Sequence, residues 1–86
     1  RGPHQIRALA ERVQVYDTVY LNGDTVVLYS EATYGFTEVP WATFRQTAPG
    51  VERATLETGG TGLRVYVDPT PPGATGPRLI HVRRVP

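Results

Sequence analysis

The first stretch of the chain has apolar residues at helical spacing. Four of them recur at i, i+3, i+4 and i+7, the spacing of one helix face: Ile6, Leu9, Ala10 and Val13. Pro3 suits the first turn of such a helix, because the N–H that proline lacks would have no partner there. The pattern therefore predicts a helix over about residues 4–14, with these four residues packed on a sheet.

The next stretch fits two structures. Val13, Val15, Val19 and Leu21 alternate as in a strand, and the pair Asn22-Gly23 is a strong signal for a two-residue hairpin turn. The same residues also fit a continued helix, with Val13, Tyr16 and Tyr20 on its core face and Gly23 as its left-handed cap. The sequence leaves both alternatives open, and the Asn-Gly pair favours the hairpin.

Beyond Gly23 the chain is typical of short strands. Runs rich in β-branched and aromatic residues predict strands at 25–29, 34–39, 41–44, 63–67 and 78–85, and residues 51–57 alternate less cleanly. Pro40 marks an edge or a bend, because proline cannot donate to a central ladder. The proline-rich segment 69–77 is expected to form a surface loop.

Alternation assigns faces within the last two strands. Leu63, Val65 and Val67 are expected on one side, with Arg64, Tyr66 and Asp68 on the other. In the final strand, Ile80 and Val82 are expected to point inward. One helix before several short strands predicts an α+β fold, one N-terminal helix packed on a small antiparallel β domain, with residues 1–86 as a single domain.

Composition narrows the function classes. There is no cysteine, and the two histidines, His4 and His81, lie at opposite ends of the chain, so neither a disulfide framework nor a metal site is expected. All nine basic residues are arginine, a bias that a GC-rich genome produces and that also occurs in some thermophile families. A net charge of +1 gives no strong overall field, so any nucleic-acid binding must come from a local cluster.

No catalytic constellation is visible. The one serine, Ser30, ends a strand without a histidine near it in sequence, and the eight acidic residues are spread singly. The segment 58–62 is rich in glycine, but it lacks the lysine of a phosphate-binding loop, so it is interpreted as a turn between strands. We therefore expect neither an enzyme nor a cofactor.

Two clusters are candidates for binding. Aromatic residues surround Pro40, and they serve either as the core of a small β domain or as a binding face: Tyr34, Phe36, Trp41 and Phe44. The basic residues gather in the last strand, where they are either a solvated surface or a phosphate-contacting tail: Arg78, His81, Arg83 and Arg84.

The order of these features resembles a family. The run Tyr20-Leu-Asn-Gly-Asp-Thr-Val-Val-Leu28 is similar to the helix end, glycine and Val-rich strand of the H-type minor pseudopilins of type II secretion and of the FimT-like minor type IV pilins. The segments 62–69 and 78–84 resemble later strands of that family. The resemblance implies that residues 14–21 are helical. The family's usual Ala-Arg-Ser-Glu-Ala-like run is missing from that segment. At the end of the chain, the glycine that usually precedes the terminal basic residues is missing as well.

The resemblance also implies a function. The chain would be the head domain of a minor pilin or pseudopilin, assembled with other subunits in the cell envelope. An apolar helix upstream of Arg1 would anchor it in the inner membrane, and the chain would then be a processed product or a fragment. By resemblance, Arg83 and Arg84 would contribute to weak DNA capture during competence, with Arg78 and His81 in support. The alternative is a small cytoplasmic β-rich adaptor that binds nucleic acid or protein through the aromatic cluster.

Overall fold

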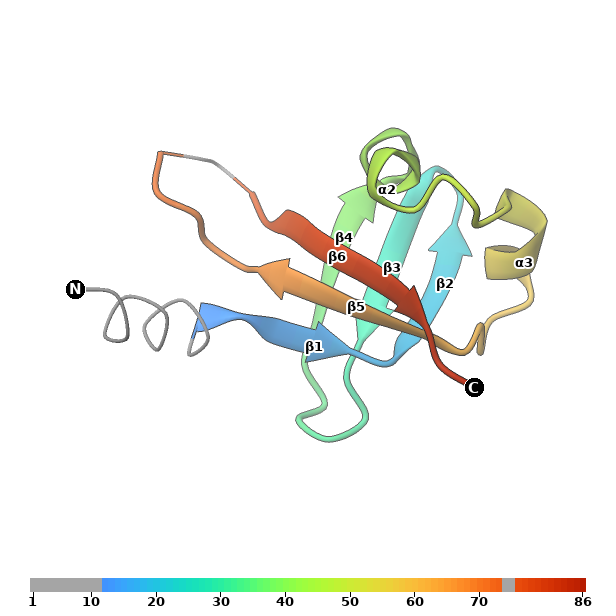
Figure 1. The fold of residues 1–86 in the computed structure, drawn as a ribbon, viewed down its shortest axis with the longest axis horizontal. Coiled ribbons are helices and arrows are strands. Elements are labelled where there is room, and N and C mark those ends of the chain that lie inside the picture. Colours follow the sequence, from blue (N-terminus) through green and yellow to red (C-terminus); the bar gives the residue numbers. More distant parts are fainter. Residues whose placement is uncertain (1–11, 74–75) are drawn as a thin grey trace.

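The computed structural model describes residues 12–73 and 76–86. In this part of the chain, strands account for 42% of the residues, and they form two antiparallel sheets of three strands each. The strands of the two sheets cross each other, as Figure 1 shows. We refer to the sheet of order β1-β5-β6 as sheet A and to the sheet of order β2-β3-β4 as sheet B.

Sheet B is built from consecutive strands: β2 (Thr18–Asn22), β3 (Thr25–Tyr29) and β4 (Phe36–Pro40). The β2–β3 turn consists of Gly23 and Asp24, because Asn22 pairs with Thr25. Gly23 has a φ of 64°, and glycine at the first central position is the requirement of a type II′ turn. The hairpin prediction is therefore confirmed, with the turn one residue later than the Asn-Gly pair suggested.

Sheet A joins distant parts of the chain. It contains β1 (Gln14–Tyr16), β5 (Leu63–Asp68) and β6 (Arg78–Arg84), with β5 in the centre. Only Asp17 separates β1 from β2, so the chain passes from sheet A to sheet B at that residue. The Asp17 N–H donates to the carbonyl of Tyr29 at 3.1 Å, and its carboxylate accepts from the Glu31 N–H at 3.0 Å.

The core lies between the two sheets and beneath two short helices, α2 (Trp41–Thr47) and α3 (Arg53–Glu57). Each helix buries one side chain completely, Phe44 in α2 and Leu56 in α3. The inward residues of both sheets complete the core, and they include Val19, Val26, Leu28, Val39, Leu63, Val65 and Val67. Neither α2 nor α3 is long and apolar enough to cross a membrane, and no other helix among the described residues is.

The predicted fold class is wrong. The described chain is mostly β, and its helices are the two short ones after β4, rather than one N-terminal helix packed on a β domain. Ile6, Leu9 and Ala10 lie outside the described residues, and half-buried Val13 leads directly into β1. The β-branched residues at 15, 18 and 19 favour strands, and α2 and α3 cover the core.

The resemblance to pilins implied that residues 14–21 are helical, and this prediction is wrong. They form β1 and most of β2, and Leu21 pairs with Val26 across the hairpin. Strands were predicted at 41–44 and, less clearly, at 51–57, but these segments contain the helices α2 and α3. Trp41 and Phe44 are three residues apart, so a helix brings their rings together, with centroids 6.1 Å apart. At the start of the helix, the Trp41 N–H donates to the carbonyl of Asp24 at 2.8 Å.

Candidate nucleic-acid interface

The outward side of sheet A concentrates positive charge. In β5, Leu63, Val65 and Val67 are buried, so Arg64 and Tyr66 project from the opposite side of the strand. In β6 the neighbours of these two residues are also basic or aromatic. We define the basic face as the outward side chains of this sheet that reach the surface, which leaves out the buried Asp68: Val15, Arg64, Tyr66, Arg78, Ile80, His81 and Arg83.

A register shift in β6 produces this arrangement. Val65 pairs with Val82 and Tyr66 with His81, but Val67 pairs with Leu79, which leaves Ile80 as an extra residue in a β-bulge. Leu79 is therefore buried, and Ile80 is 47% exposed instead of pointing inward as predicted. The bulge allows Arg78, His81 and Arg83 to share one face, although their spacing in sequence does not fit strict alternation.

Two cross-strand pairs form the centre of the basic face. Arg64 lies directly opposite Arg83, and Tyr66 lies directly opposite His81. The rings of Tyr66 and His81 are 5.8 Å apart between centroids and inclined by 36°. Like charges directly opposite each other on neighbouring strands are destabilising, so the arginine pair places a net repulsion at this position.

One carboxylate lies on this side of the sheet. It is Asp68, the one acidic residue in the strands of sheet A, and it lies directly opposite Arg78. Asp68 is buried and forms its ion pair with Arg12, at 3.2 Å, so no carboxylate among the described residues is paired with Arg64 or Arg83 at the centre of the face. Within the described ranges, neither Arg64, Arg78 nor Arg83 takes part in an ion pair. The small net charge of the chain therefore conceals a local excess of positive charge.

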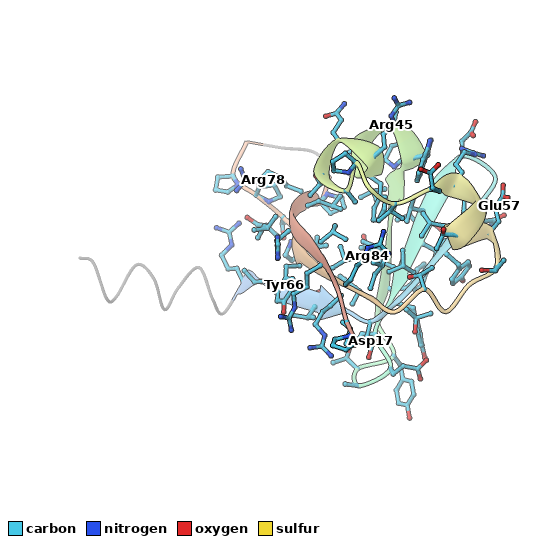
Figure 2. All side chains as sticks on the ribbon, turned by 45° about the vertical axis from the view of Figure 1, so that its right-hand side comes forward. Asp17, Arg45, Glu57, Tyr66, Arg78 and Arg84 are labelled. Carbon is cyan, nitrogen blue, oxygen red and sulfur yellow. The ribbon has the colours of Figure 1, made fainter. Side chains whose placement is uncertain are left out.

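Arg84 belongs to a different surface. It pairs with Leu63, whose side chain is buried, and the Arg84 guanidinium donates to the carbonyl of Gly50 at 2.9 Å. It lines a small hollow between β6 and the segment that joins α2 to α3. Figure 2 shows Tyr66 and Arg84 on opposite sides of the β6 ribbon. Three of the four basic residues predicted to act together are thus brought together, and Arg84 is separated from them.

The predicted aromatic cluster is divided. Phe44 is completely buried and Trp41 packs against the core, whereas Tyr34 and Phe36 are 78% and 65% exposed on the side of sheet B. The Arg53 guanidinium covers the Trp41 ring at 5.6 Å and forms an ion pair with Asp24 at 3.2 Å. Trp41 and Phe44 are therefore structural, and the four residues do not form one binding face.

The other candidate sites have structural roles. Ser30 is buried, and its hydroxyl accepts from the Thr33 N–H at 3.4 Å within the β3–β4 loop. The glycines of segment 58–62 have positive φ angles and make a turn, which connects α3 to β5 rather than two strands. Among the described residues, no three carboxylate or imidazole groups come together as a metal site would require.

Arg64 and Tyr66 were missing from the sequence-based candidate set. Alternation in residues 63–68 had assigned them to the outward side, but only the pairing of β5 with β6 shows that they adjoin Arg83 and His81. No protein-family model matches the chain, and the comparisons with curated proteins and with solved structures found no match either.

Proposed function

We propose that this domain is a non-enzymatic binding module that holds single-stranded nucleic acid on the basic face of sheet A. The observation that carries the proposal is the Arg64–Arg83 pair, two arginines directly opposite each other without a carboxylate partner among the described residues. Phosphate would convert this repulsion into an attraction, because each guanidinium could donate to a phosphate oxygen.

The neighbouring aromatic pair supports a single strand rather than a duplex. Tyr66 and His81 expose ring surface between Arg64 and Arg83 on one side and Arg78 on the other. Bases stack on aromatic rings only when they are free of a duplex, and such stacking tolerates any sequence. Three arginines predict weak binding with a log–log salt slope of about −2 for a single strand.

The test is fluorescence anisotropy of a labelled oligothymidine at low salt. The variant Arg64→Gln/Arg83→Gln removes the central pair and is expected to bind about tenfold more weakly, with a salt slope reduced by about 1.4. The matched control is Arg45→Gln/Arg84→Gln, which removes the same charge from α2 and from the side of β6 turned away from the basic face. The control should bind like the parent.

Three outcomes decide against the proposal. Equal losses in the two variants would show that net charge alone attracts the oligonucleotide. No binding by the parent would favour a purely structural subunit. A duplex of the same length, bound as tightly as the single strand, would show that the Tyr66–His81 pair does not stack with bases.

The pilin assignment remains a separate prediction. It required a helix through about Leu21, and β1 and β2 occupy that segment, so the resemblance lacks its main structural support. Anchoring in the inner membrane and assembly with other pilin subunits belong to the same prediction. The encoded sequence upstream of Arg1 tests it, because a pilin has a basic leader, a Gly-Phe-type cleavage site and an apolar run there.

A further inference from the structure

The outward side of sheet B is aromatic. Its strands pair so that Thr18, Tyr29 and Phe36 form one cross-strand row, and Tyr20, Val27 and Glu38 form the next. Together with Tyr34 in the β3–β4 loop, these residues define the aromatic face. Tyr20 is 40% exposed, and Phe36 and Tyr34 are more exposed still. Side chains of this size and type are enriched at the centres of protein interfaces.

The loop that carries Tyr34 is held in a strained conformation. Tyr34 has a φ of 60°, and it is the one residue other than glycine with a positive φ in the part of the chain that the structure describes. For an L-residue this conformation costs about 1–2 kcal/mol. Short hydrogen bonds fix the loop, from the Tyr34 N–H to the Ser30 carbonyl at 2.8 Å and from the Ser30 N–H to the Gly35 carbonyl at 2.9 Å. The exposed ring is thus presented on a rigid support, which reduces the entropy lost on binding.

The two outward faces carry opposite charge. The strands β2, β3 and β4 contain no arginine, and Glu38 is exposed on the aromatic face. Glu31 lies beside the aromatic face, because its carboxylate accepts from the hydroxyl of Thr18, a residue of that face, at 3.3 Å. The five large apolar side chains that the described residues expose lie on or beside these two faces: Val15 and Ile80 with the basic face, and Tyr20, Tyr34 and Phe36 with the aromatic face.

We infer that the aromatic face binds the basic face of a second copy of this chain. Arg64 and Arg83 of one copy would lie against the aromatic rings and Glu38 of the next, where guanidinium groups can form cation–π contacts and ion pairs. Because the two faces lie on opposite sides of the sandwich, such an interface is head-to-tail and does not close with two subunits. Association therefore extends into a linear chain of domains.

This inference goes beyond nucleic-acid binding and makes a different use of the same arginines. The basic face cannot hold a nucleic acid and a second copy at once, so an oligonucleotide should shorten the assemblies. The aromatic face has no part in nucleic-acid binding. Variants of that face therefore separate the two activities.

Sedimentation velocity of the whole chain at low salt tests the inference. The parent is expected to sediment faster as its concentration rises, and moderate salt should reduce this effect because the facing charges are screened. The basic-face variant Arg64→Gln/Arg83→Gln and the aromatic-face variant Tyr34→Asn/Phe36→Thr should each remain monomeric. Phe36 and Tyr34 are exposed, so the second variant should keep the fold, and Tyr34→Asn alone serves if it does not.

Mixing the two variants gives the decisive result. Each variant retains one intact face, so an equimolar mixture should form a one-to-one dimer with twice the monomer mass and nothing larger. The aromatic-face variant should also bind oligothymidine as the parent does. A parent that stays monomeric at all concentrations, or two variants that do not associate when mixed, would overturn the inference without affecting the proposed nucleic-acid binding.

Discussion

Arg64 and Arg83 face each other across the β5–β6 ladder, and within the described residues neither has an acidic partner. A cross-strand pair of like charges lowers stability, and opposite-charge pairs in the same position contribute about 0.2–1 kcal/mol. An external anion bound between the two guanidinium groups would relieve this repulsion. This relationship makes stability and binding respond to substitution in opposite directions.

Replacing one member of the pair tests that relationship. Arg64→Gln should raise the free energy of unfolding by about 0.2–1 kcal/mol while weakening oligothymidine binding. Urea unfolding, followed by circular dichroism, measures the first effect and anisotropy the second. The control is Arg45→Gln, at an exposed position in the last turn of α2, which should leave binding unchanged and should not raise stability, because a positive charge in a last turn favours the helix. Loss of stability in Arg64→Gln would mean that this arginine has a structural role.

The β2–β3 turn should depend on glycine at one position. Gly23 has a positive φ, so Gly23→Ala should lower the free energy of unfolding by about 1–2 kcal/mol, although nothing lies within 4 Å of the added methyl group. Gly50 is equally open and its φ is not positive, so Gly50→Ala should be neutral or slightly stabilising. Thermal unfolding of the two variants compares them directly. Equal losses would show that the turn conformation is not the cause.

Helix α3 should depend on one side chain. It has five residues, and Leu56 is its only fully buried one, so Leu56→Ala should cost about 2–5 kcal/mol. The neighbouring Glu57 is exposed, and Glu57→Ala should change stability by less than about 0.5 kcal/mol. Chemical unfolding measures both. A small effect of Leu56→Ala would mean that α3 contributes little to the core.

The positive φ of Tyr34 is expected to lower the stability of the fold, while the exposed ring contributes to self-association. Asparagine adopts a positive φ more easily than tyrosine, so Tyr34→Asn should keep or raise the melting temperature, whereas Tyr34→Ala cannot relieve the strain. Both variants lose the ring, so both should reduce self-association. If Tyr34→Asn destabilises as much as Tyr34→Ala, the exposed ring is part of the fold and not of an interface.

One tyrosine should make stability sensitive to alkaline pH. Burial raises the pKa of Tyr16 above its ordinary value near 10, because the ionised phenol is poorly solvated. Above about pH 10 the folded protein keeps a proton that the unfolded chain has lost, so the contribution of this group is complete below that pH and falls as the pH rises through the folded pKa.

The variant Tyr16→Phe isolates this effect. It removes the titrating group and the hydrogen bond from the phenol to the Gln14 side chain at 2.7 Å. Urea unfolding at about pH 8 and about pH 11 should show a smaller decrease for the variant than for the parent. Equal decreases would show that other groups cause the alkaline loss of stability.

Local signals predicted several elements correctly. The β-branched run at 25–29 forms β3, the alternation at 63–68 forms β5, and Gly23 makes a hairpin turn. In these segments the pattern fits one structure only, because a strand has alternating faces and a tight turn needs a positive φ. The same alternation also placed Arg64 and Tyr66 outward, which is half of the candidate site.

Local signals did not predict the helices α2 and α3. Trp41 and Phe44 suit a strand by propensity and a helix by spacing, and the helix forms because Phe44 can then fill the core between the sheets. The segment containing Leu56 was ambiguous for the same reason. Short apolar runs fit both structures, and burial in the assembled core selects between them.

The sequence by itself determined which residues were candidates for an interface, and the tertiary structure decided which of them share one face. The arginines of the last strand are visible in the chain, as are the aromatic residues around Pro40. The bulge at Ile80 brings Arg83 opposite Arg64 and directs Arg84 toward Gly50, while Phe44 is buried and Phe36 exposed. Strand register and the side on which each residue lies depend on contacts between segments distant in sequence, and local periodicity does not contain that information.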